Sequence, residues 1–585
     1  MDEKKKYIII VESPTQAQAI QSILGNHYNV IATRGHILRT DLAASHPDDK
    51  NDFSVRYAFK NRDLMSDIIN TAYEASIIFI ATDPDQEGEA VAWHLAYLLR
   101  EISNDIQRII LDEITPEKIK KNLGSPVPFN TALVDAQKAR MVIDQLIGTG
   151  LSPLLNQIDP LARSAGRVQS AALIVIYKHE LGLIDSPFSE NSKVYIEIKL
   201  GKKEANFSLK ELIFRGNKII NPDTQIDLLK KLLSEKFSIA KLSAELTENG
   251  YLNTYQLLQE GIQRFGRSGR QIMKTAQQLY EGIETQNGWL NLITYPRTES
   301  IKISNQSLRE ITDYFIRKGF NVDIREGDNG TTEGGPHAIL PVQFSDEFSP
   351  NALKIQLTRN QFELYKLIWN WSLNVSLHGA GKLTQRIRLN SKNFQFTIER
   401  DLYDPVEINS NQIIEKDPVY VLDFFMDANE NNPDHFDEAA LLHVLYKQGI
   451  GRPSTLAEIV PILIKRKYIE LVGKKIHITA LGREVAQILD LNFDSVTGPA
   501  VTKKMETHLR RIAADKENYL PVVSKFKNEL DNSILKFQEK AHHQDIDSDK
   551  LCSICSKPLI KRHTRNGIFF VCEEHREINR NFQNI

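Results

Sequence analysis

Three short runs of apolar, mostly β-branched residues near the N-terminus restrict what this chain can fold into. They span Tyr7 to Val11, Ile77 to Ala81 and Arg108 to Leu111, and each precedes acids and then a helical pattern. Buried parallel strands show this pattern, because helices cover both faces of a parallel sheet. The sequence therefore predicts an N-terminal α/β domain.

Acidic residues lie where the first two strands end. Glu12 follows the first run, and Asp83, Asp85 and Glu87 follow the second. Asp83 and Asp85 face the same way in an extended segment, and Glu12 can join them if the two strands are neighbours. Such carboxylates repel unless a cation lies among them, so the four residues form a candidate Mg²⁺ site. The alternative is a solvated acidic turn that caps the helix starting near Gly88.

Length and composition exclude several classes of protein. At 585 residues the chain is too long for a single core and predicts three or more domains. The net charge is −2, so a polyanion would have to bind at local basic patches. The first apolar run is too short for a signal peptide, and no stretch approaches the roughly 18 apolar residues of a membrane helix. We therefore expect a cytoplasmic protein that does not bind a membrane.

Six motifs, taken in order, resemble those of the type IA DNA topoisomerases. They are VESP (11–14), DPDQEGE (83–89), SAGRVQS (164–170), TYPRTES (294–300), HAILP (337–341) and GIGRPST (449–455). The resemblance runs from about residue 7 to the C-terminus. It implies an isomerase that cuts one DNA strand through a transient 5′-phosphotyrosine, passes another strand and reseals the first. Such an enzyme relaxes negatively supercoiled DNA or decatenates it without ATP.

The resemblance also implies a multidomain fold of α/β and α+β parts. It consists of an N-terminal Toprim domain, a toroidal core with winged-helix-like elements and a C-terminal zinc ribbon. We assign the Toprim domain to 1–130, a helical DNA-groove domain to 131–187 and 429–542, a β-rich hinge or arch domain to 188–252 and 379–428, a tyrosine-bearing domain to 253–378, and the zinc module to 548–585.

The resemblance makes Tyr295 of TYPRTES the nucleophile. A tyrosine hydroxyl has a pKa of about 10, so its surroundings must stabilise the phenolate or remove its proton. Arg297 can offer a planar fork of donors to the scissile phosphate, and Pro296 fixes one backbone angle between the two. The exchange of one phosphodiester for another needs no nucleotide, and the chain has no GxxxxGK[ST] loop. Without the motif, one tyrosine among 18 would be read as structural.

Further DNA contacts follow from the same motifs. His337 matches the active-site histidine of the family and would donate to a phosphate oxygen or hold the cleaved strand. Taken alone, it would be a loop histidine that caps backbone groups, and the arginines below would be surface residues. The expected DNA-binding residues are Arg140, Arg167, Gln169, Ser170, Arg452, Ser454 and Thr455.

Residues 436–489 can be interpreted without the resemblance. A helical pattern over 437–448 precedes the turn GIGRP, a second helix and an alternating stretch with a turn near Gly473. Thr455 and Glu458 have the spacing of a capping box at the start of the second helix. Helix, turn, helix and hairpin together predict a winged-helix-like unit whose second helix could bind a phosphate at its N-terminus. Such units also pack as plain structure.

All three cysteines follow residue 550, which excludes a disulfide framework. CSIC (552–555) and CEEH (572–575) supply paired ligands on two knuckles, so Cys552, Cys555, Cys572 and His575 form a candidate Zn²⁺ site. His563 is an alternative fourth ligand. Basic and aromatic residues between the knuckles are typical of single-strand binding.

Two neutral residues depart from the family pattern. Gln16 stands where the family has a lysine, and Gln86 stands where it has an arginine, so proton transfer and phosphate binding are in question. The alternatives are a degenerate, non-catalytic single-stranded DNA-binding relative, or another Toprim enzyme such as a primase or nuclease. We expect a monomer that binds single-stranded regions of supercoiled DNA, with a helicase as one candidate partner.

Overall fold

The computed structural model describes most of the chain. The described residues are 7–40, 57–73, 75–103, 105–158, 164–185, 194–200, 203–219, 226–285, 288–319, 337–378, 380–402, 419–426, 435–546, 555–557, 560–564, 567–571 and 578–579. None of the helices in these ranges is long and apolar enough to cross a membrane.

The N-terminal domain is built on a four-stranded parallel sheet. Its strands lie in the order β2 (Tyr28–Ala32), β1 (Tyr7–Val11), β5 (Ile77–Ile80) and β6 (Ile106–Arg108). The first two predicted strands are thus neighbours. The third predicted strand, over 108–111, is misplaced, because β6 ends at Arg108, where that strand was expected to begin. The Arg108 side chain, at the end of β6, donates hydrogen bonds to the Thr82 and Asp83 carbonyls of the loop that follows β5.

Helices cover both faces of this sheet, as the apolar strands require. Ile8 and Ile10 of β1 pack on one face with residues of α2 (Arg62–Ala72) and α3 (Gln86–Leu99). Ile9 and Val11 pack on the other face, in the core shared with the rest of the molecule. Around the sheet lie α1 (Pro14–Leu24), α4 (Pro116–Leu123) and the hairpin of β3 (Leu38–Thr40) and β4 (Tyr57–Phe59).

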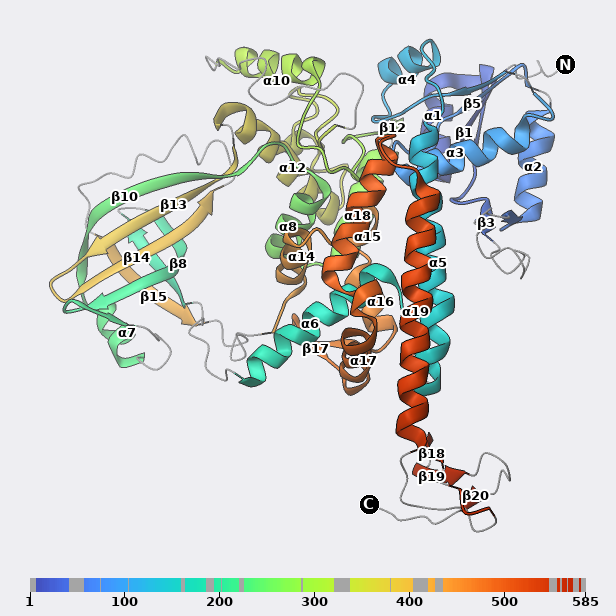
Figure 1. Cartoon of the computed structure of the whole chain (residues 1–585). Helices are drawn as coiled ribbons and strands as arrows, with labels where there is room; N and C mark the ends of the chain where they lie inside the picture. The colour runs from blue at the N-terminus through green and yellow to red at the C-terminus, as the bar shows by residue number, and fades with distance from the viewer. Residues whose placement is uncertain are drawn as a thin grey trace.

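A helical body follows in the chain. Its long helices are α5 (Thr131–Ile158), α6 (Arg167–Asp185), α17 (Ala480–Thr497), α18 (Pro499–Ala513) and α19 (Tyr519–Ile546). Figure 1 shows α19 running beside α5, so the two ends of this body are joined although they are far apart in sequence.

A second sheet stands at the far end of the molecule from the N-terminal domain (Figure 1). All its pairings are antiparallel, and contact between β14 and β8 closes it on itself. It has its own apolar core and carries α7 (Ile226–Leu232). Its strands follow the order β14 (Phe394–Leu402), β13 (Ala380–Asn390), β10 (Lys236–Asn249), β15 (Val419–Met426), β7 (Val194–Leu200), β8 (Lys203–Phe214) and β9 (Asn217–Ile219).

The tyrosine lobe, described over 251–285, 288–319 and 337–378, lies between this sheet and the N-terminal domain. The chain reaches it through β10 and leaves it through β13. Tyr295 lies in an irregular segment between β12 and α10 rather than on a helix or strand. The elements of the lobe are α8 (Thr254–Phe265), α9 (Gly269–Glu281), β11 (Ile283–Thr285), β12 (Gly288–Leu290), α10 (Asn305–Arg317), α11 (Pro350–Leu353) and α12 (Arg359–His378).

The helix, turn, helix and hairpin predicted near 436–489 are present. They are α14 (Glu438–Lys447), α15 (Pro453–Leu456), α16 (Ile459–Lys465), β16 (Ile469–Val472) and β17 (Lys475–Ile478). The second helix is split in two, and the predicted capping box of Thr455 and Glu458 is wrong. The Thr455 hydroxyl instead accepts a hydrogen bond from the Arg452 amide at 2.9 Å, because the helix begins earlier, at Pro453.

A small antiparallel sheet follows α19 near the C-terminus. Its strands are β18 (Ile560–Thr564), β19 (Gly567–Val571) and β20 (Ile578–Asn579). The predicted zinc ligands Cys552, Cys572 and His575 lie outside the described residues. The zinc site therefore stays a prediction.

Candidate active site

Tyr295 and the acids that follow β5 meet at the contact between the tyrosine lobe and the N-terminal domain. The Tyr295 hydroxyl donates a hydrogen bond to Asp85 Oδ2 at 2.7 Å and lies 3.4 Å from Asp83 Oδ2. Two motifs more than 200 positions apart thus form one site. Tyr295 is only 5% exposed, so the hydroxyl is covered in this arrangement.

The backbone around Tyr295 is held by the segment that follows β6. The Tyr295 amide donates to the Asp112 carbonyl at 2.8 Å. The Tyr280 ring packs edge-on against the Tyr295 ring with centroids 5.2 Å apart, and its hydroxyl donates to the Leu111 carbonyl at 2.6 Å. Burial, and then the charges of Asp85 and Asp83, raise the pKa of Tyr295 well above its usual value. The closed site therefore holds a protonated tyrosine.

The carboxylates form a cluster in which Asp83 is buried and Glu12, Asp85 and Glu87 are partly exposed. Glu12 accepts a hydrogen bond from the Asp83 amide at 3.1 Å, across the adjacent strands β1 and β5. Burial, and then the nearby Asp83 and Asp85, raise the pKa of Glu12 well above its usual value. Burial and the neighbouring Asp85 raise the pKa of Asp83 to about 7. Both shifts reflect burial first and the neighbouring carboxylates second, and a cation among these groups would oppose both effects.

Asp85 also caps the helix after it. Its side chain accepts a hydrogen bond from the Gly88 amide at 2.8 Å, at the start of α3. Asp85 therefore caps the helix, as the alternative to a metal site predicted. Capping uses only one of its carboxylate oxygens, because the other oxygen accepts the hydrogen bond from Tyr295. Among the described residues, no three His, Cys, Asp or Glu side chains are arranged to hold a metal ion together. The metal role of Glu12, Asp83, Asp85 and Glu87 stays a prediction.

Of the two glutamines that depart from the family pattern, Gln16 contacts this cluster directly and Gln86 lies at the start of α3, next to Asp85 in the chain. Gln16 is 2% exposed, and its Nε2 donates to Asp83 Oδ1 at 2.9 Å, while its Oε1 accepts from the Ser13 amide at 3.3 Å in a capping box. Gln86 Nε2 is buried and has no hydrogen-bond partner among the described residues. An unpaired buried donor is costly, so a hydrogen-bond acceptor such as a phosphate oxygen would suit this position.

Arg297 lies half-buried beside the acids. Burial alone would lower the pKa of its guanidinium, but the nearby Tyr295 and Asp85 raise it. The arginine therefore remains charged next to the tyrosine that it accompanies in the sequence. This is the position from which it could neutralise a phosphate that enters between the two lobes.

His337 lies beside Asp112, the residue whose carbonyl accepts the hydrogen bond from the Tyr295 amide. Its Nε2 is 3.7 Å from Asp112 Oδ2, and Lys118 Nζ is 2.9 Å from the other oxygen of that carboxylate. Nδ1 of His337 is buried without a hydrogen-bond partner among the described residues. Burial lowers the pKa of His337, against the opposite effect of Asp112. The imidazole is thus neutral at pH 7 and can donate from one nitrogen only.

Two of the three predicted DNA-binding arginines, Arg167 and Arg452, belong to one ion-pair network. Arg167, which is 1% exposed, pairs with Glu506 and with Asp144 at 3.0 Å. Arg452 pairs with the same Glu506 and with Glu299 at 2.7 Å. Burial alone would raise the pKa of Glu506, but the two arginines lower it. These contacts stabilise the packing of α6, α15 and α18 against one another, and DNA could reach Arg167 only if they rearranged.

The other predicted DNA-binding residues lie at two places, one beside the acids and one beside Gly166. Arg140 Nη1 lies 4.0 Å from Glu87 and 3.5 Å from the Ser454 hydroxyl, so it joins the acids to the helical body. Ser170 is 3% exposed, and its hydroxyl accepts a hydrogen bond from the Gly166 amide at 3.3 Å. Gln169 is half-buried beside Gly166. Arg140 is therefore the one among these that the structure places beside the candidate metal ligands.

The sequence interpretation missed Arg108. This residue is 1% exposed, and its guanidinium pairs with Glu89 at 3.0 Å and donates to the carbonyls of Ile80, Thr82 and Asp83. It therefore fixes the loop that carries the acids. The available signal was a charged residue at the edge of an apolar strand, where it must find partners.

Comparison with known proteins identifies the family. A model of the DNA topoisomerase family matches residues 128–524, which is more than half of the chain, and a model of the Toprim domain matches residues 7–114.

The chain belongs to the type IA DNA topoisomerases.

Two relatives agree with this assignment. DNA topoisomerase 1 of Treponema pallidum (strain Nichols) is 30% identical over 600 residues, which cover 97% of this chain and 82% of the relative. The structure of full-length topoisomerase I from Thermotoga maritima superposes with a TM-score of 0.68 at 26% identity, and the match covers 97% of this chain and 96% of that one. This topoisomerase therefore has an N-terminal Toprim domain and a type IA core, and it acts by cleaving DNA and passing a strand.

Proposed function

We propose that Tyr295 is the nucleophile that forms the transient 5′-phosphotyrosine bond. The observation that carries this proposal is the hydrogen bond of 2.7 Å from its hydroxyl to Asp85, which joins the tyrosine lobe to the acids of the Toprim domain. In the reaction the tyrosine oxygen bonds to phosphorus, the 3′ oxygen of the neighbouring nucleotide leaves, and Asp85 Oδ2 is placed to receive the phenolic proton.

The described arrangement corresponds to a closed gate. Tyr295 is 5% exposed and the carboxylates hold its hydroxyl, so a DNA strand must separate the tyrosine lobe from the Toprim domain to reach it. After cleavage, one DNA end is attached to the tyrosine lobe, and movement of that lobe would open the strand for passage. Resealing then reverses the exchange without consuming ATP.

Mg²⁺ is the cofactor that fits the acids. Glu12 and Asp83 have raised pKa values because they are buried among like charges, and hard carboxylate oxygens suit this ion. Asp83, Asp85 and Glu87 would hold the ion with Glu12 beside them, and Mg²⁺ needs only one or two direct carboxylates. When bound, the ion would draw a DNA phosphate to the site and offset its charge.

Arg297 and His337 complete the proposed catalytic set. Arg297 is a charged donor beside Tyr295, suited to the phosphate under attack. His337 offers one neutral N–H donor to a phosphate oxygen. Gln16 cannot supply a proton to the leaving oxygen, so we assign that role to the carboxyl of Glu12.

Covalent capture on a single-stranded oligonucleotide tests the proposal. The natural chain with Mg²⁺ should become attached to the fragment that carries the new 5′ end, and Tyr295→Phe should abolish attachment because the nucleophilic oxygen is gone. Tyr314→Phe, the same change on α10 of the same lobe, should retain attachment. Attachment that persists in Tyr295→Phe would assign the chemistry to another residue.

Finer features of this enzyme belong to the same proposal. We propose that it binds single-stranded regions of negatively supercoiled DNA and relaxes or decatenates the DNA. We further propose that it is a cytoplasmic monomer, with a helicase as a candidate partner. We also retain the domain boundaries predicted from the sequence and the DNA contacts Arg140, Arg167, Gln169, Ser170, Arg452, Ser454 and Thr455. A C-terminal zinc module with Cys552, Cys555, Cys572 and His575 is proposed from the spacing of those residues.

A further inference from the structure

Asp112 joins the Toprim side of the candidate active site to two segments of the tyrosine lobe. Its backbone carbonyl accepts the hydrogen bond of 2.8 Å from the Tyr295 amide. Its side-chain Oδ2 lies 3.7 Å from His337 Nε2. Tyr295 and His337 both belong to the proposed catalytic set, so the residue between them is placed to affect the reaction.

The turn before α4 holds the Asp112 side chain in place. Thr115 caps α4 by accepting a hydrogen bond from the Lys118 amide at 3.3 Å. Lys118 Nζ lies 2.9 Å from Asp112 Oδ1 and 3.0 Å from Asp112 Oδ2. Ile114 and Ile119 are 2% and 0% exposed, so they anchor the turn and the helix. Because both carboxylate oxygens lie against one ammonium group, the carboxylate has little freedom to rotate.

His337 is held by the segment that carries Tyr295. The hydroxyl of Thr294, the residue before Tyr295, donates a hydrogen bond of 2.8 Å to the carbonyl of Ala338. His337 and Tyr295 therefore belong to one lobe, whereas Asp112 lies within the Toprim match. The carboxylate can act on the imidazole only while the two lobes are in contact.

The position of the carboxylate favours one tautomer of the imidazole. A neutral imidazole has a single N–H, either on Nδ1 or on Nε2. In His337, Nε2 lies toward the carboxylate, and Nδ1 is buried without a hydrogen-bond partner among the described residues. A proton on Nε2 is attracted by the carboxylate, whereas a lone pair there would be repelled. A proton on Nδ1 would be an unpaired buried donor, so Nε2 is the favoured site for the proton.

The same geometry leaves this N–H able to bind a phosphate. A separation of 3.7 Å is too long for a hydrogen bond, so Asp112 orients the Nε2 donor without occupying it. Lys118 offsets the charge of the carboxylate, which would otherwise repel a DNA phosphate. Two further acids, Glu113 and Glu310, lie near the same ammonium group. Burial raises their pKa values, and Lys118 opposes that shift.

We propose that Asp112 is a positioning residue for His337, whose carboxylate keeps the imidazole proton on Nε2, the nitrogen that donates to the DNA phosphate in the closed gate. The proposal rests on the role given to His337 in the proposed function. Lys118 holds the carboxylate and limits its repulsion of the phosphate. When the lobes separate, His337 loses this partner, so the histidine is prepared for reaction only while the gate is closed.

A double-mutant cycle tests whether Asp112 acts through His337. The rate of covalent capture is measured at saturating oligonucleotide and Mg²⁺ for the natural chain, Asp112→Asn, His337→Ala and the double variant. Asp112→Asn alone should slow capture by roughly tenfold, as removal of a carboxylate that orients a histidine typically does. It should have no further effect once His337 is replaced. Equal losses in the two backgrounds would overturn the proposal, because Asp112 would then act through the Tyr295 backbone or through folding.

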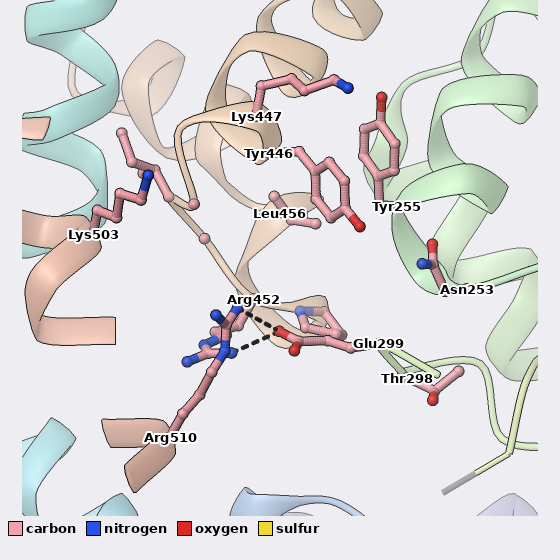
Figure 2. Close-up of a pocket in the computed structure, with 14 residues that line it drawn as sticks. Asn253, Tyr255, Thr298, Glu299, Tyr446, Lys447, Arg452, Leu456, Lys503 and Arg510 are labelled. Atoms are coloured by element: carbon pink, nitrogen blue, oxygen red, sulfur yellow. Dashed lines mark hydrogen bonds and ion pairs between the residues drawn. The ribbon is translucent and has the colours of Figure 1, made fainter. Parts of the chain in front are cut away.

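Glu299 provides a matched control. It also joins the tyrosine lobe to another part of the chain, since its carboxylate lies 2.7 Å from Arg452 and 3.6 Å from Arg510 (Figure 2). Glu299→Gln removes a contact between lobes that does not involve His337, so it should slow capture by the same factor in both backgrounds. If His337→Ala masks both changes alike, Asp112 acts on closure of the gate rather than on the histidine, and the proposal falls.

Nitrogen-15 NMR of the full chain with labelled histidine reads the tautomer directly. The signals of His337 are identified by their loss in His337→Gln. At pH 8, without metal or DNA, we expect a protonated Nε2 and a bare Nδ1 in the natural chain, and a larger share of the other tautomer in Asp112→Asn. A natural chain whose His337 carries its proton on Nδ1 would contradict the proposal.

The same spectra, followed over pH, give the pKa of His337 in each variant. In the natural chain burial lowers this pKa, while Asp112 raises it and Lys118 lowers it. Asp112→Asn should therefore lower the pKa and Lys118→Gln should raise it. Glu117→Gln, which changes an exposed acid on α4, should leave it unchanged. A variant that only loosened the fold would expose the ring and raise the pKa, so a rise in both Asp112→Asn and Lys118→Gln would overturn the proposal.

Covalent capture separates this proposal from the function on which it rests. Capture that Tyr295→Phe abolishes, together with equal losses from Asp112→Asn in both backgrounds, would remove the role of Asp112 and leave the nucleophile assigned. A natural chain that is never captured would overturn both.

Discussion

At the scale of single residues, the candidate active site carries the neutral Gln16 where the family has a charged lysine. Its amide donates to Asp83 at 2.9 Å and is almost completely buried, so it satisfies the carboxylate without neutralising it. The position was singled out from the sequence as a departure from the family. Only the structure shows that the glutamine contacts a candidate metal ligand.

We expect Gln16→Lys to raise the rate of Mg²⁺-dependent plasmid relaxation several-fold. An ammonium group beside Asp83 and Glu12 could supply a proton, which an amide cannot. The measurement compares initial relaxation rates of the natural chain, Gln16→Lys and Gln16→Met, the last of which keeps the size and removes the donor. Equal rates in the natural chain and Gln16→Lys would show that proton supply does not limit turnover.

Asp83 should make the stability of the protein depend on pH. Its pKa is about 7 in the folded protein against about 4 when unfolded, so the folded state binds more protons between these values. Its contribution is therefore most favourable below pH 4 and is lost as the pH rises to 7. Asp83→Asn should then be more stable than the natural chain at pH 8, by on the order of 1 to 3 kcal/mol, with little difference at pH 4.5.

Urea unfolding with a chelator present, at pH 4.5 and pH 8, measures this difference. Asp67→Asn, an exposed site on α2, serves as the control and should show no pH-dependent gain. Added Mg²⁺ should stabilise the natural chain at pH 8 more than Asp83→Asn. A gain from Asp83→Asn that is equal at both pH values would contradict the raised pKa.

At the scale of elements, the contact between the start of α3 and the end of β5 sets the site. Asp85 caps α3, Arg108 from β6 holds the carbonyls of the connecting loop, and Gly88 lets the helix approach that loop. The helix, the strand and the acids were predictable from the pattern of residues. The inward turn of Arg108 was not, because an arginine in an apolar run does not reveal its partners.

Gly88→Ala should abolish covalent capture and destabilise the Toprim domain. A Cβ at this position would lie 2.1 Å from the Asp83 carbonyl oxygen, so the acidic loop must move away from the helix. Gly182→Ala on α6 is the matched control. No atom lies within 4 Å of its added Cβ, and it should raise stability by about 0.5 to 1 kcal/mol. Capture assays and thermal unfolding of both variants check this prediction. Normal capture by Gly88→Ala would show that the loop can shift without losing function.

At the scale of the whole molecule, the candidate active site is assembled from two lobes that separate parts of the chain provide. The Tyr295 segment is held by the Asp112 carbonyl and the acids of the Toprim domain, while the seven-stranded sheet packs its core apart from them. The small sheet near the C-terminus follows α19 at the opposite end of that helix from the active site (Figure 1). We therefore expect DNA cleavage not to require the C-terminal region.

A chain that ends after Ile546 should retain covalent capture and unfold within a few degrees of the full chain. All proposed catalytic residues, from Glu12 to His337, precede that point. Its affinity for single-stranded DNA should fall, because the basic and aromatic residues of the tail are removed. Metal analysis should find bound zinc in the full chain and none in the shortened one. Loss of capture in the shortened chain would show that the tail supports the active site.

The sequence by itself determined the local elements and the chemical groups of this topoisomerase. The apolar runs specify strands by burial, the acids and the tyrosine have the required functional groups, and the six ordered motifs resemble one family. Tertiary structure decided which groups meet. Through it the Tyr295 hydroxyl donates a hydrogen bond to Asp85, and Arg167 and Arg452 form ion pairs with Glu506. The ring of Tyr446 likewise stacks on that of Tyr255. Contacts between residues so far apart in the chain depend on how whole lobes pack, which no local pattern encodes.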